Sequence, residues 1–224
     1  MKDIFLLDVD DTLLDFGRAE REQVIDTLRA HGIPAGEGAA ERFHAINARL
    51  WKQLERGETT RAELIVERFR LLLRELGAAG DAQALSAHFF GGMGQRAYPL
   101  AGAEEFLRAL SARGRVYAVT NGSKVLQRRR MAAAGILPCF TDVFISEEVG
   151  CNKPQEGYVR HVAEHIPGFC RERAVYVGDS LTSDMVCAER LHVDFILFGR
   201  ARPAGYAGMV AEDHRAALAL IDTL

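Results

Sequence analysis

Three aspartates stand close together near the start of the chain, in the tract Asp8-Val9-Asp10-Asp11-Thr12. The tract directly follows the apolar run Ile4-Phe5-Leu6-Leu7, which is too short for a helix core and is typical of a buried strand. Because side chains alternate along a strand, Asp8 and Asp10 start out on the same side while Val9 turns into the core. Two carboxylates about 4 Å apart repel by roughly 4 kcal/mol at an effective dielectric near 20. The tract therefore predicts an acidic site balanced by a divalent cation, a lysine or a shared proton.

Three further polar segments follow predicted strands. We expect them at the same edge of a parallel sheet, because the carboxyl ends of its strands meet there. Aspartates gathered at that edge make a hard-oxygen site of the kind that Mg²⁺ prefers. A lysine neutralises a phosphoryl group, and a threonine hydroxyl with backbone N–H groups at a helix start holds phosphate oxygens. The segments are Thr120-Asn121-Gly122-Ser123, Asn152-Lys153-Pro154 and Gly178-Asp179-Ser180-Leu181-Thr182-Ser183-Asp184.

The elements that must position these segments alternate between helix and strand after Tyr98. Such alternation predicts a parallel sheet covered on both faces. Between Asp15 and Tyr98 the apolar residues repeat at helical spacing without a strand, which predicts four helices in an inserted module. The expected fold is α/β: a Rossmann-like doubly wound parallel sheet core with an inserted all-α helical cap. We expect residues 1–15 and 97–224 to form the core and residues 16–96 to form the cap.

Helix ends are marked by hydroxyl residues and glycines. The third cap helix is expected to start near Thr59-Thr60, whose hydroxyls precede Glu63 in a capping-box pattern. The fourth cap helix is expected to end at Phe90, before Gly91-Gly92. The helix that follows the predicted strand 174–177 is expected to begin near Leu181, within the last polar segment.

The four polar segments, in this order and strand context, resemble the haloacid dehalogenase (HAD) superfamily, specifically its Mg²⁺-dependent phosphatases with an aspartate nucleophile. The resemblance covers the whole chain. It implies that Asp8 attacks phosphorus and becomes an aspartyl phosphate. It also implies that Asp10 protonates the leaving oxygen and then deprotonates the water that hydrolyses the intermediate. A carboxylate and a phosphate dianion are both negative, so a cation must bridge them for this chemistry.

The same resemblance implies roles for the other candidate residues. Thr120, Asn121 and Lys153 bind the phosphoryl group, and Lys153 also balances the charge of Asp8. Mg²⁺ is the implied cofactor, with Asp10 contributing its backbone carbonyl and Asp184 supporting the site from the next turn. The implied metal-site residues are Asp8, Asp10, Asp179 and Asp184.

A finer likeness points to one branch of that superfamily, which contains housekeeping 5′-nucleotidases active on noncanonical pyrimidine nucleotides. The helical insertion resembles that branch's cap, which closes over the crevice and reads the substrate. Phe16 and Arg18, at the cap hinge, are the candidate substrate contacts. The predicted function is hydrolysis of a small-molecule phosphomonoester, with nucleoside 5′-monophosphates as the preferred class. The likeness rests on the segments 10–16, 119–122, 146–150 and 178–184.

Other functions stay open at this stage. The same aspartyl phosphate serves small sugar-phosphate or phosphoglycolate-type phosphatases, and phosphomutases that transfer the group to a sugar. A regulatory or binding protein that retains the fold without catalysis is the alternative from another class. A dehalogenase is disfavoured, because it needs neither the acid/base Asp10 nor a metal.

Several of these residues also have simpler structural interpretations. Thr120 is a candidate cap for the helix that starts at Ser123, and Asp184 a candidate partner for the positive end of its own helix. Taken without its neighbours in the sequence, Lys153 is interpreted as a surface lysine. The run Arg128-Arg129-Arg130 is typical of a solvated helix face. The aromatic residues at helical spacing in the cap, Phe43, Trp51 and Phe69, are typical of core.

Composition bounds the remaining expectations. The chain has 224 residues, 48% hydrophobic and 26% charged, which is globular usage. A net charge of -3 gives no electrostatic reason to expect nucleic acid or an anionic membrane as partner. Without a signal-peptide or transmembrane pattern, the expected location is cytoplasmic. The four widely spaced cysteines are read as reduced thiols, and Cys187 with His192 is a weak candidate for a thiol nucleophile. The sequence leaves the oligomeric state open.

Overall fold

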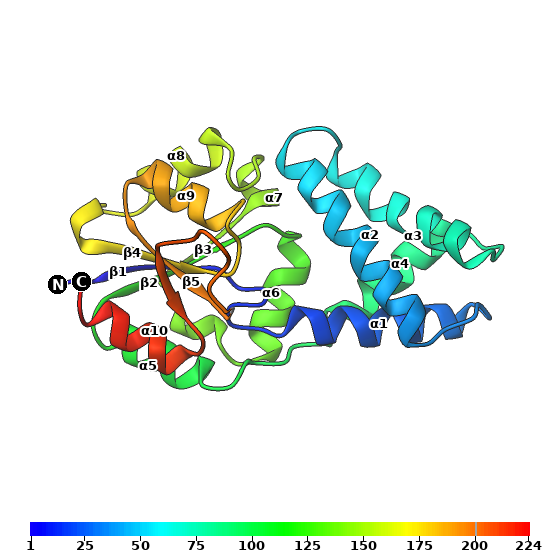
Figure 1. Cartoon of the computed structure of the whole chain (residues 1–224), viewed down its shortest axis with the longest axis horizontal. Coiled ribbons are helices and arrows are strands. Elements are labelled where there is room, and N and C mark those ends of the chain that lie inside the picture. The colour runs from blue at the N-terminus through cyan, green and yellow to red at the C-terminus, as the bar shows by residue number, and fades with distance from the viewer. Residues whose placement is uncertain (200) are drawn as a thin grey trace. The chain divides into compact units, whose positions relative to one another are not determined.

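The computed structural model describes residues 1–199 and 201–224 and contains a six-stranded, fully parallel sheet (Figure 1). The strand order is β3-β2-β1-β4-β5-β6. The chain moves outward from β1 to β3, then returns to place β4 on the other side of β1, so the order reverses beside β1. The predicted doubly wound α/β fold is confirmed. The strands are β1 (Ile4–Leu7), β2 (Arg115–Thr120), β3 (Asp142–Ile145), β4 (Ala174–Gly178), β5 (Asp194–Phe198) and β6 (Met209–Ala211).

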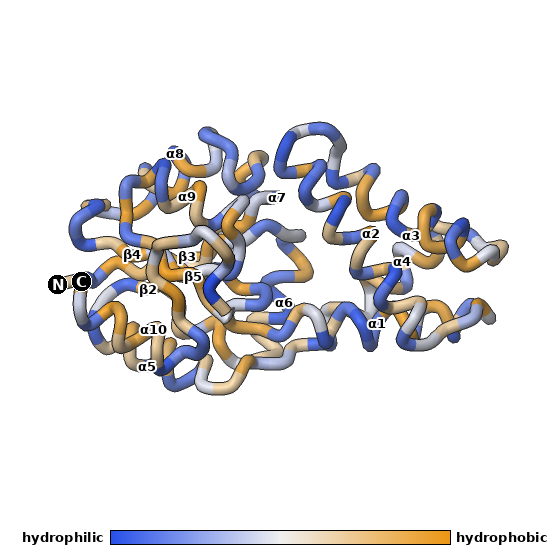
Figure 2. The backbone as a smooth tube through the Cα atoms, in the orientation of Figure 1, coloured by the Kyte–Doolittle hydropathy of each residue, from blue (hydrophilic) through white to orange (hydrophobic). Residues whose placement is uncertain are grey.

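Two hydrophobic layers cover the sheet, one on each face. Because successive side chains point to opposite faces, Phe5 and Leu7 of β1 enter one layer while Ile4 and Leu6 enter the other. The first layer packs under α5 (Ala103–Ser111), α6 (Lys124–Ala133) and α10 (His214–Ile221). The second packs under α8 (Glu156–His165) and α9 (Asp184–Leu191). The hydropathy colouring follows this arrangement, with hydrophobic strands between helices of mixed colour (Figure 2).

The chain divides into two compact units, one formed by residues 1–15 and 99–224 and the other by residues 16–98. The second unit is all helical, and its boundary at Tyr98 lies two residues beyond the position expected from sequence. It consists of α1 (Phe16–Ala30), α2 (Glu37–Glu55), α3 (Arg61–Leu76) and α4 (Ala82–Met93). Its core contains the mutually packed rings of Phe43, Phe69 and Phe89, as expected for the first two, whereas Trp51 is only half-buried. Thr60 and Glu63 form the predicted capping box of α3.

The two points where the core chain is interrupted lie side by side. Leu14 and Pro99 form an isolated antiparallel bridge, and the Leu100 N–H donates to the Leu13 carbonyl at 2.9 Å. Leu13 and Leu14 are fully buried in the first hydrophobic layer. The core unit is therefore closed by its own backbone hydrogen bonds at the place where the helical unit is inserted.

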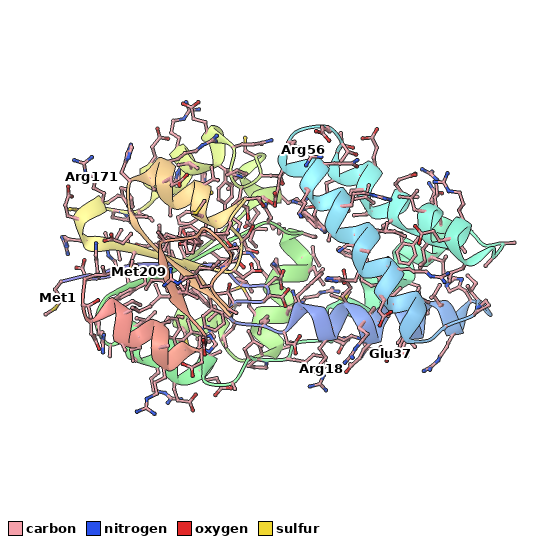
Figure 3. All side chains as sticks on the ribbon, viewed as in Figure 1. Met1, Arg18, Glu37, Arg56, Arg171 and Met209 are labelled. Carbon is pink, nitrogen blue, oxygen red and sulfur yellow. The ribbon has the colours of Figure 1, made fainter. Side chains whose placement is uncertain are left out.

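Two helix limits expected from the sequence were wrong. Helix α4 does not stop at Phe90 but continues to Met93, and its close packing needs glycine at position 92, because a Cβ there would lie 2.2 Å from the Gln23 side chain of α1. Helix α9 begins at Asp184 and not near Leu181, since residues 181–183 form a turn. The sequence did not predict the short elements α7 (Ser146–Val149) and β6. Met209, which is labelled in Figure 3, is the first residue of β6. Among the described residues, no helix combines the length and apolar character needed to cross a membrane.

Candidate active site

Asp8 lies directly beyond the C-terminal end of β1 and is 5% exposed. Its backbone N–H donates to the Val177 carbonyl of β4 at 3.0 Å, which continues the strand pairing as far as this residue. Its Oδ1 accepts from the Lys153 ammonium at 2.6 Å, and its Oδ2 lies 3.4 Å from the Thr12 hydroxyl. The carboxylate is therefore withdrawn from bulk water and fixed in direction by a cation.

Lys153 is the cation at the centre of the site, although it comes from the short loop between α7 and α8. Its ammonium donates to Asp8, to Asp184 Oδ1 at 2.7 Å and to the Val119 carbonyl at 2.8 Å, which uses its three N–H bonds. The Asn121 side chain holds the backbone of this loop from both sides, accepting from the Lys153 N–H at 2.8 Å and donating to its carbonyl at 3.1 Å. With 2% of its surface exposed, Lys153 is not the surface lysine of the simpler interpretation.

Asp184 begins α9 and is 1% exposed. Its Oδ1 accepts from the Tyr176 hydroxyl at 2.9 Å as well as from Lys153, and its Oδ2 accepts from the Ser180 N–H at 3.1 Å. Gly178 permits this arrangement, because a Cβ at that position would lie 2.5 Å from Asp184 Oδ2. Asp184 thus orients Lys153 and the turn that carries Asp179.

Asp8, Asp179 and Asp184 each place a carboxylate oxygen within 4.8 Å of the others. Three carboxylates and one ammonium leave two negative charges unbalanced, which is the charge of one divalent cation. The donor set consists of carboxylate oxygens, the ligand type that Mg²⁺ prefers. The residues present therefore fit Mg²⁺, with Asp8, Asp179 and Asp184 as the carboxylates that would hold it.

The electrostatics of the cluster agree with that fit. Burial raises the pKa of Asp8 well above its usual value; Lys153 opposes this rise, and the charges of Asp184 and Asp179 add to it. Burial works against the charge on Lys153, but Asp184 and Asp8 outweigh burial and hold the pKa of the ammonium well above its ordinary range. Lys153 stays charged, and the surplus negative charge rests on the acids.

A second polar cluster surrounds Asp10 and Thr120, beside the first. The Gln127 amide donates to Asp10 Oδ2 at 2.9 Å and to the Thr120 hydroxyl oxygen at 2.7 Å. Arg130 is fully buried and pairs with Asp10 Oδ1. Thr120 does not cap α6: the N-cap is Ser123, and the Lys124 N–H donates to the Glu147 carboxylate at 2.7 Å.

Sequence reasoning missed Gln127 and Arg130. The expectation that residues 128–130 form a solvated face was wrong for Arg130, which has 0% exposure, although Arg129 is exposed. The signal that could have found them is spacing, because residues 127, 130 and 131 share one face of a helix. Met131 on that face belongs to the core.

The remaining candidates lie elsewhere. Asp11 is exposed and lies four residues beyond the end of β1. Phe16 and Arg18 lie at the start of α1 in the helical unit, where the Arg18 side chain pairs with Glu22 at 2.9 Å (Figure 3). Their role as substrate contacts stays a prediction. Burial raises the pKa of Cys187 to about 12, which leaves its thiol protonated and unsuited to nucleophilic catalysis.

The family model described as haloacid dehalogenase-like hydrolase matches residues 2–192. The chain belongs to the haloacid dehalogenase-like hydrolases. The resemblance seen in the sequence is therefore confirmed at the level of the family.

Three comparisons describe its relatives within that family. The chain is 35% identical over 180 residues to YfnB of Bacillus subtilis (strain 168), named as a HAD-hydrolase, covering 80% of this chain and 77% of YfnB. It is 32% identical over 194 residues to the pyrimidine 5′-nucleotidase PynA of Streptococcus pneumoniae (strain ATCC BAA-255 / R6), covering 86% and 82%. A crystal structure of YfnB bound to magnesium superposes with a TM-score of 0.92 at 28% identity, covering 99% of each chain.

Proposed function

We propose that this hydrolase is a Mg²⁺-dependent phosphomonoesterase that acts through an aspartyl phosphate on Asp8. The observation that carries the proposal is the buried Asp8 carboxylate, held by Lys153 at 2.6 Å beside two further acids. A carboxylate fixed next to a cation is a prepared nucleophile for an anionic phosphate ester. The similarity to a magnesium-bound structure and to a named nucleotidase supports the same chemistry.

In the first step an oxygen of Asp8 forms a bond to phosphorus as the bond from phosphorus to the alcohol oxygen breaks. Asp10 gives its proton to that oxygen, so the alcohol leaves neutral. In the second step a water oxygen attacks phosphorus, Asp10 takes the water proton, and the bond to Asp8 breaks to release inorganic phosphate. Asp10 therefore ends the cycle protonated, as it began.

The phosphoryl group needs positive charge and hydrogen-bond donors around it. Lys153 supplies positive charge next to Asp8, and the Asn121 side chain fixes the backbone that presents it. The Thr120 oxygen accepts from Gln127, which leaves its own O–H free to donate to a phosphoryl oxygen. Bound Mg²⁺ would supply the positive charge that lets two anions approach, held by Asp8, Asp179 and the Asp10 carbonyl, with Asp184 supporting them.

We further propose nucleoside 5′-monophosphates, pyrimidine ones foremost, as the preferred substrates. The likeness to PynA spans most of both chains, including the helical unit. That unit leaves the core five residues after Asp10 and is proposed as the cap that reads the substrate, with Phe16 and Arg18 as its candidate contacts.

The test is phosphate release from a panel of nucleoside monophosphates and small sugar phosphates, with Mg²⁺ or with EDTA. Asp8→Asn is expected to fall to background, because the amide cannot act as the nucleophile. Asp11→Asn is the matched control, an exposed acid in the same tract, and is expected to keep wild-type turnover.

Each departure from this result has its own meaning. Turnover that survives both Asp8→Asn and EDTA would refute the mechanism. A preference for sugar phosphates would refute the nucleotide assignment alone, and transfer of the phosphoryl group to a sugar would identify a phosphomutase. If no compound is turned over, the result would favour a regulatory or binding protein that retains the fold without catalysis.

A further inference from the structure

Helix α6 presents two polar side chains to the interior of the core unit. Gln127 and Arg130 lie one turn apart and are 1% and 0% exposed. A fully buried arginine is rare and persists only where its charge is paired. Its neighbours on the same helix, Arg128 and Arg129, are in contact with solvent, so burial singles out Arg130 from an apparently uniform basic run.

The two side chains form a fork around the carboxylate of Asp10. Arg130 donates to Asp10 Oδ1, and Gln127 Nε2 donates to Asp10 Oδ2 at 2.9 Å. Gln127 Oε1 accepts from Arg130 at 3.2 Å, which locks the two arms together. A carboxylate has about four acceptor positions, so each oxygen keeps one position for a reacting proton.

Gln127 also connects this fork to Thr120, because the same Nε2 lies 2.7 Å from the Thr120 hydroxyl oxygen. Gly122 leaves the space for it: a Cβ at that position would lie 2.6 Å from Gln127 Cγ. The backbone after β2 is therefore shaped so that one amide contacts the side chains of both Asp10 and Thr120.

We propose that Arg130 and Gln127 are positioning residues: Arg130 sets the direction of the Asp10 carboxylate, and Gln127 sets both that carboxylate and the Thr120 hydroxyl. This inference rests on the proposed function, in which Asp10 transfers protons and Thr120 binds the phosphoryl group. A misplacement of about 1 Å costs on the order of 10²-fold in rate, and correctly placed proton transfer contributes about 10²–10⁴-fold.

Substitutions of Arg130 and of Gln127 are expected to have different effects. Arg130→Met removes the contact to Asp10 Oδ1, while Gln127 keeps its bonds to Asp10 Oδ2 and Thr120, so kcat for a nucleoside monophosphate is expected to fall about 10²-fold while KM stays within about threefold. Gln127→Leu also releases Thr120, so it is expected to raise KM as well as lower kcat. Arg130→Lys keeps one charged donor and is expected to recover part of the lost rate.

A second substrate separates positioning from a structural role. p-Nitrophenyl phosphate has a leaving group that departs without a proton. Arg130→Met is therefore expected to retain the phosphorylation of Asp8 and to lose the hydrolysis of the aspartyl phosphate. The phosphoenzyme then accumulates, and intact-mass spectrometry after an acid quench detects the added phosphoryl group on the protein. Wild type and the matched control Arg129→Met, the same substitution at the exposed neighbour, are expected to show far less of it.

The outcomes distinguish this inference from the proposed function. If wild type hydrolyses neither substrate, the proposed function fails. If wild type is active but Arg130→Met matches Arg129→Met, or loses both substrates equally without phosphoenzyme, the positioning role is refuted. Should Arg130→Met fail to fold, Gln127→Leu decides: a raised KM with a lowered kcat supports the inference, and unchanged constants overturn it.

Discussion

Replacing Lys153 by Met tests whether the acidic cluster depends on an internal cation. The substitution keeps the length and most of the volume of the side chain but removes its charge. In the native arrangement the ammonium lies 2.6 Å from Asp8 Oδ1 and 2.7 Å from Asp184 Oδ1. Each attraction amounts to about 6 kcal/mol at an effective dielectric near 20, before the cost of burying the charges is subtracted. Removing one partner of such a buried pair typically costs about 3–5 kcal/mol.

We therefore expect Lys153→Met to lose about 3–5 kcal/mol of unfolding free energy in urea titrations with EDTA at neutral pH. Added Mg²⁺ is expected to restore part of this loss, and to raise the stability of the variant more than that of wild type, because the variant leaves three carboxylates unbalanced. Lys124→Met is the control, since that ammonium belongs to an exposed pair with Glu148 at 3.3 Å. An exposed pair contributes at most about 1 kcal/mol.

Two results would refute this reasoning. One is a loss for Lys153→Met no larger than that for Lys124→Met, which would mean that the buried ammonium does not stabilise the cluster. The other is an equal effect of Mg²⁺ on wild type and Lys153→Met, which would mean that the metal and the lysine do not balance the same negative charge.

Two further predictions follow from the same site. Burial holds the pKa of Asp8 above its ordinary value of 3.8, so without metal the folded protein binds more protons than the unfolded chain. Stability should therefore fall as pH rises from about 4 through the folded pKa. Urea titrations across this range should show that slope in EDTA and a weaker slope in Mg²⁺ or in Asp8→Asn, and identical slopes would count against it. Gly178→Ala should push Asp184 aside, because the added methyl would lie 2.5 Å from its Oδ2, and should lower the affinity for Mg²⁺ measured by calorimetry at least tenfold. Gly38→Ala, with open space around its Cβ, is the control; a Gly178→Ala affinity equal to that of Gly38→Ala would contradict the prediction.

The strands and the first polar cluster could be predicted because their signals are local. The apolar runs 4–7 and 174–177 are bounded by polar residues or glycine, and parallel strands bring their carboxyl ends to one edge. Strand β6 gave no such signal, since Met209–Ala211 is short, only partly buried and pairs with β5 alone. Helix α4 runs through Gly91 and Gly92, and the close approach of Gly92 to Gln23 is a tertiary contact that no local pattern encodes.

The second polar cluster was missed for a related reason. In the sequence, Arg130 is one of three consecutive arginines, and only its helical spacing from Gln127, beside the apolar Met131, sets it apart. Its burial is decided by where α6 meets the end of β1, 120 residues away along the chain. The Asp10 carboxylate then selects the one arginine that faces it. Long-range charge pairing of this kind appears only once the fold is known.

The paired backbone at Leu14 and Pro99 has a consequence for how a chain of this design can change. Because the exit and entry points of the core are hydrogen-bonded neighbours, the segment between them acts as a very long loop whose ends are already joined. The entropy of closing such a loop grows by only about 0.6 kcal/mol for each doubling of its length. An inserted segment of a different length can therefore replace residues 16–98 without altering the register of the sheet. If the helical unit is the proposed cap, reaction chemistry in the sheet and substrate choice in that unit can diverge independently.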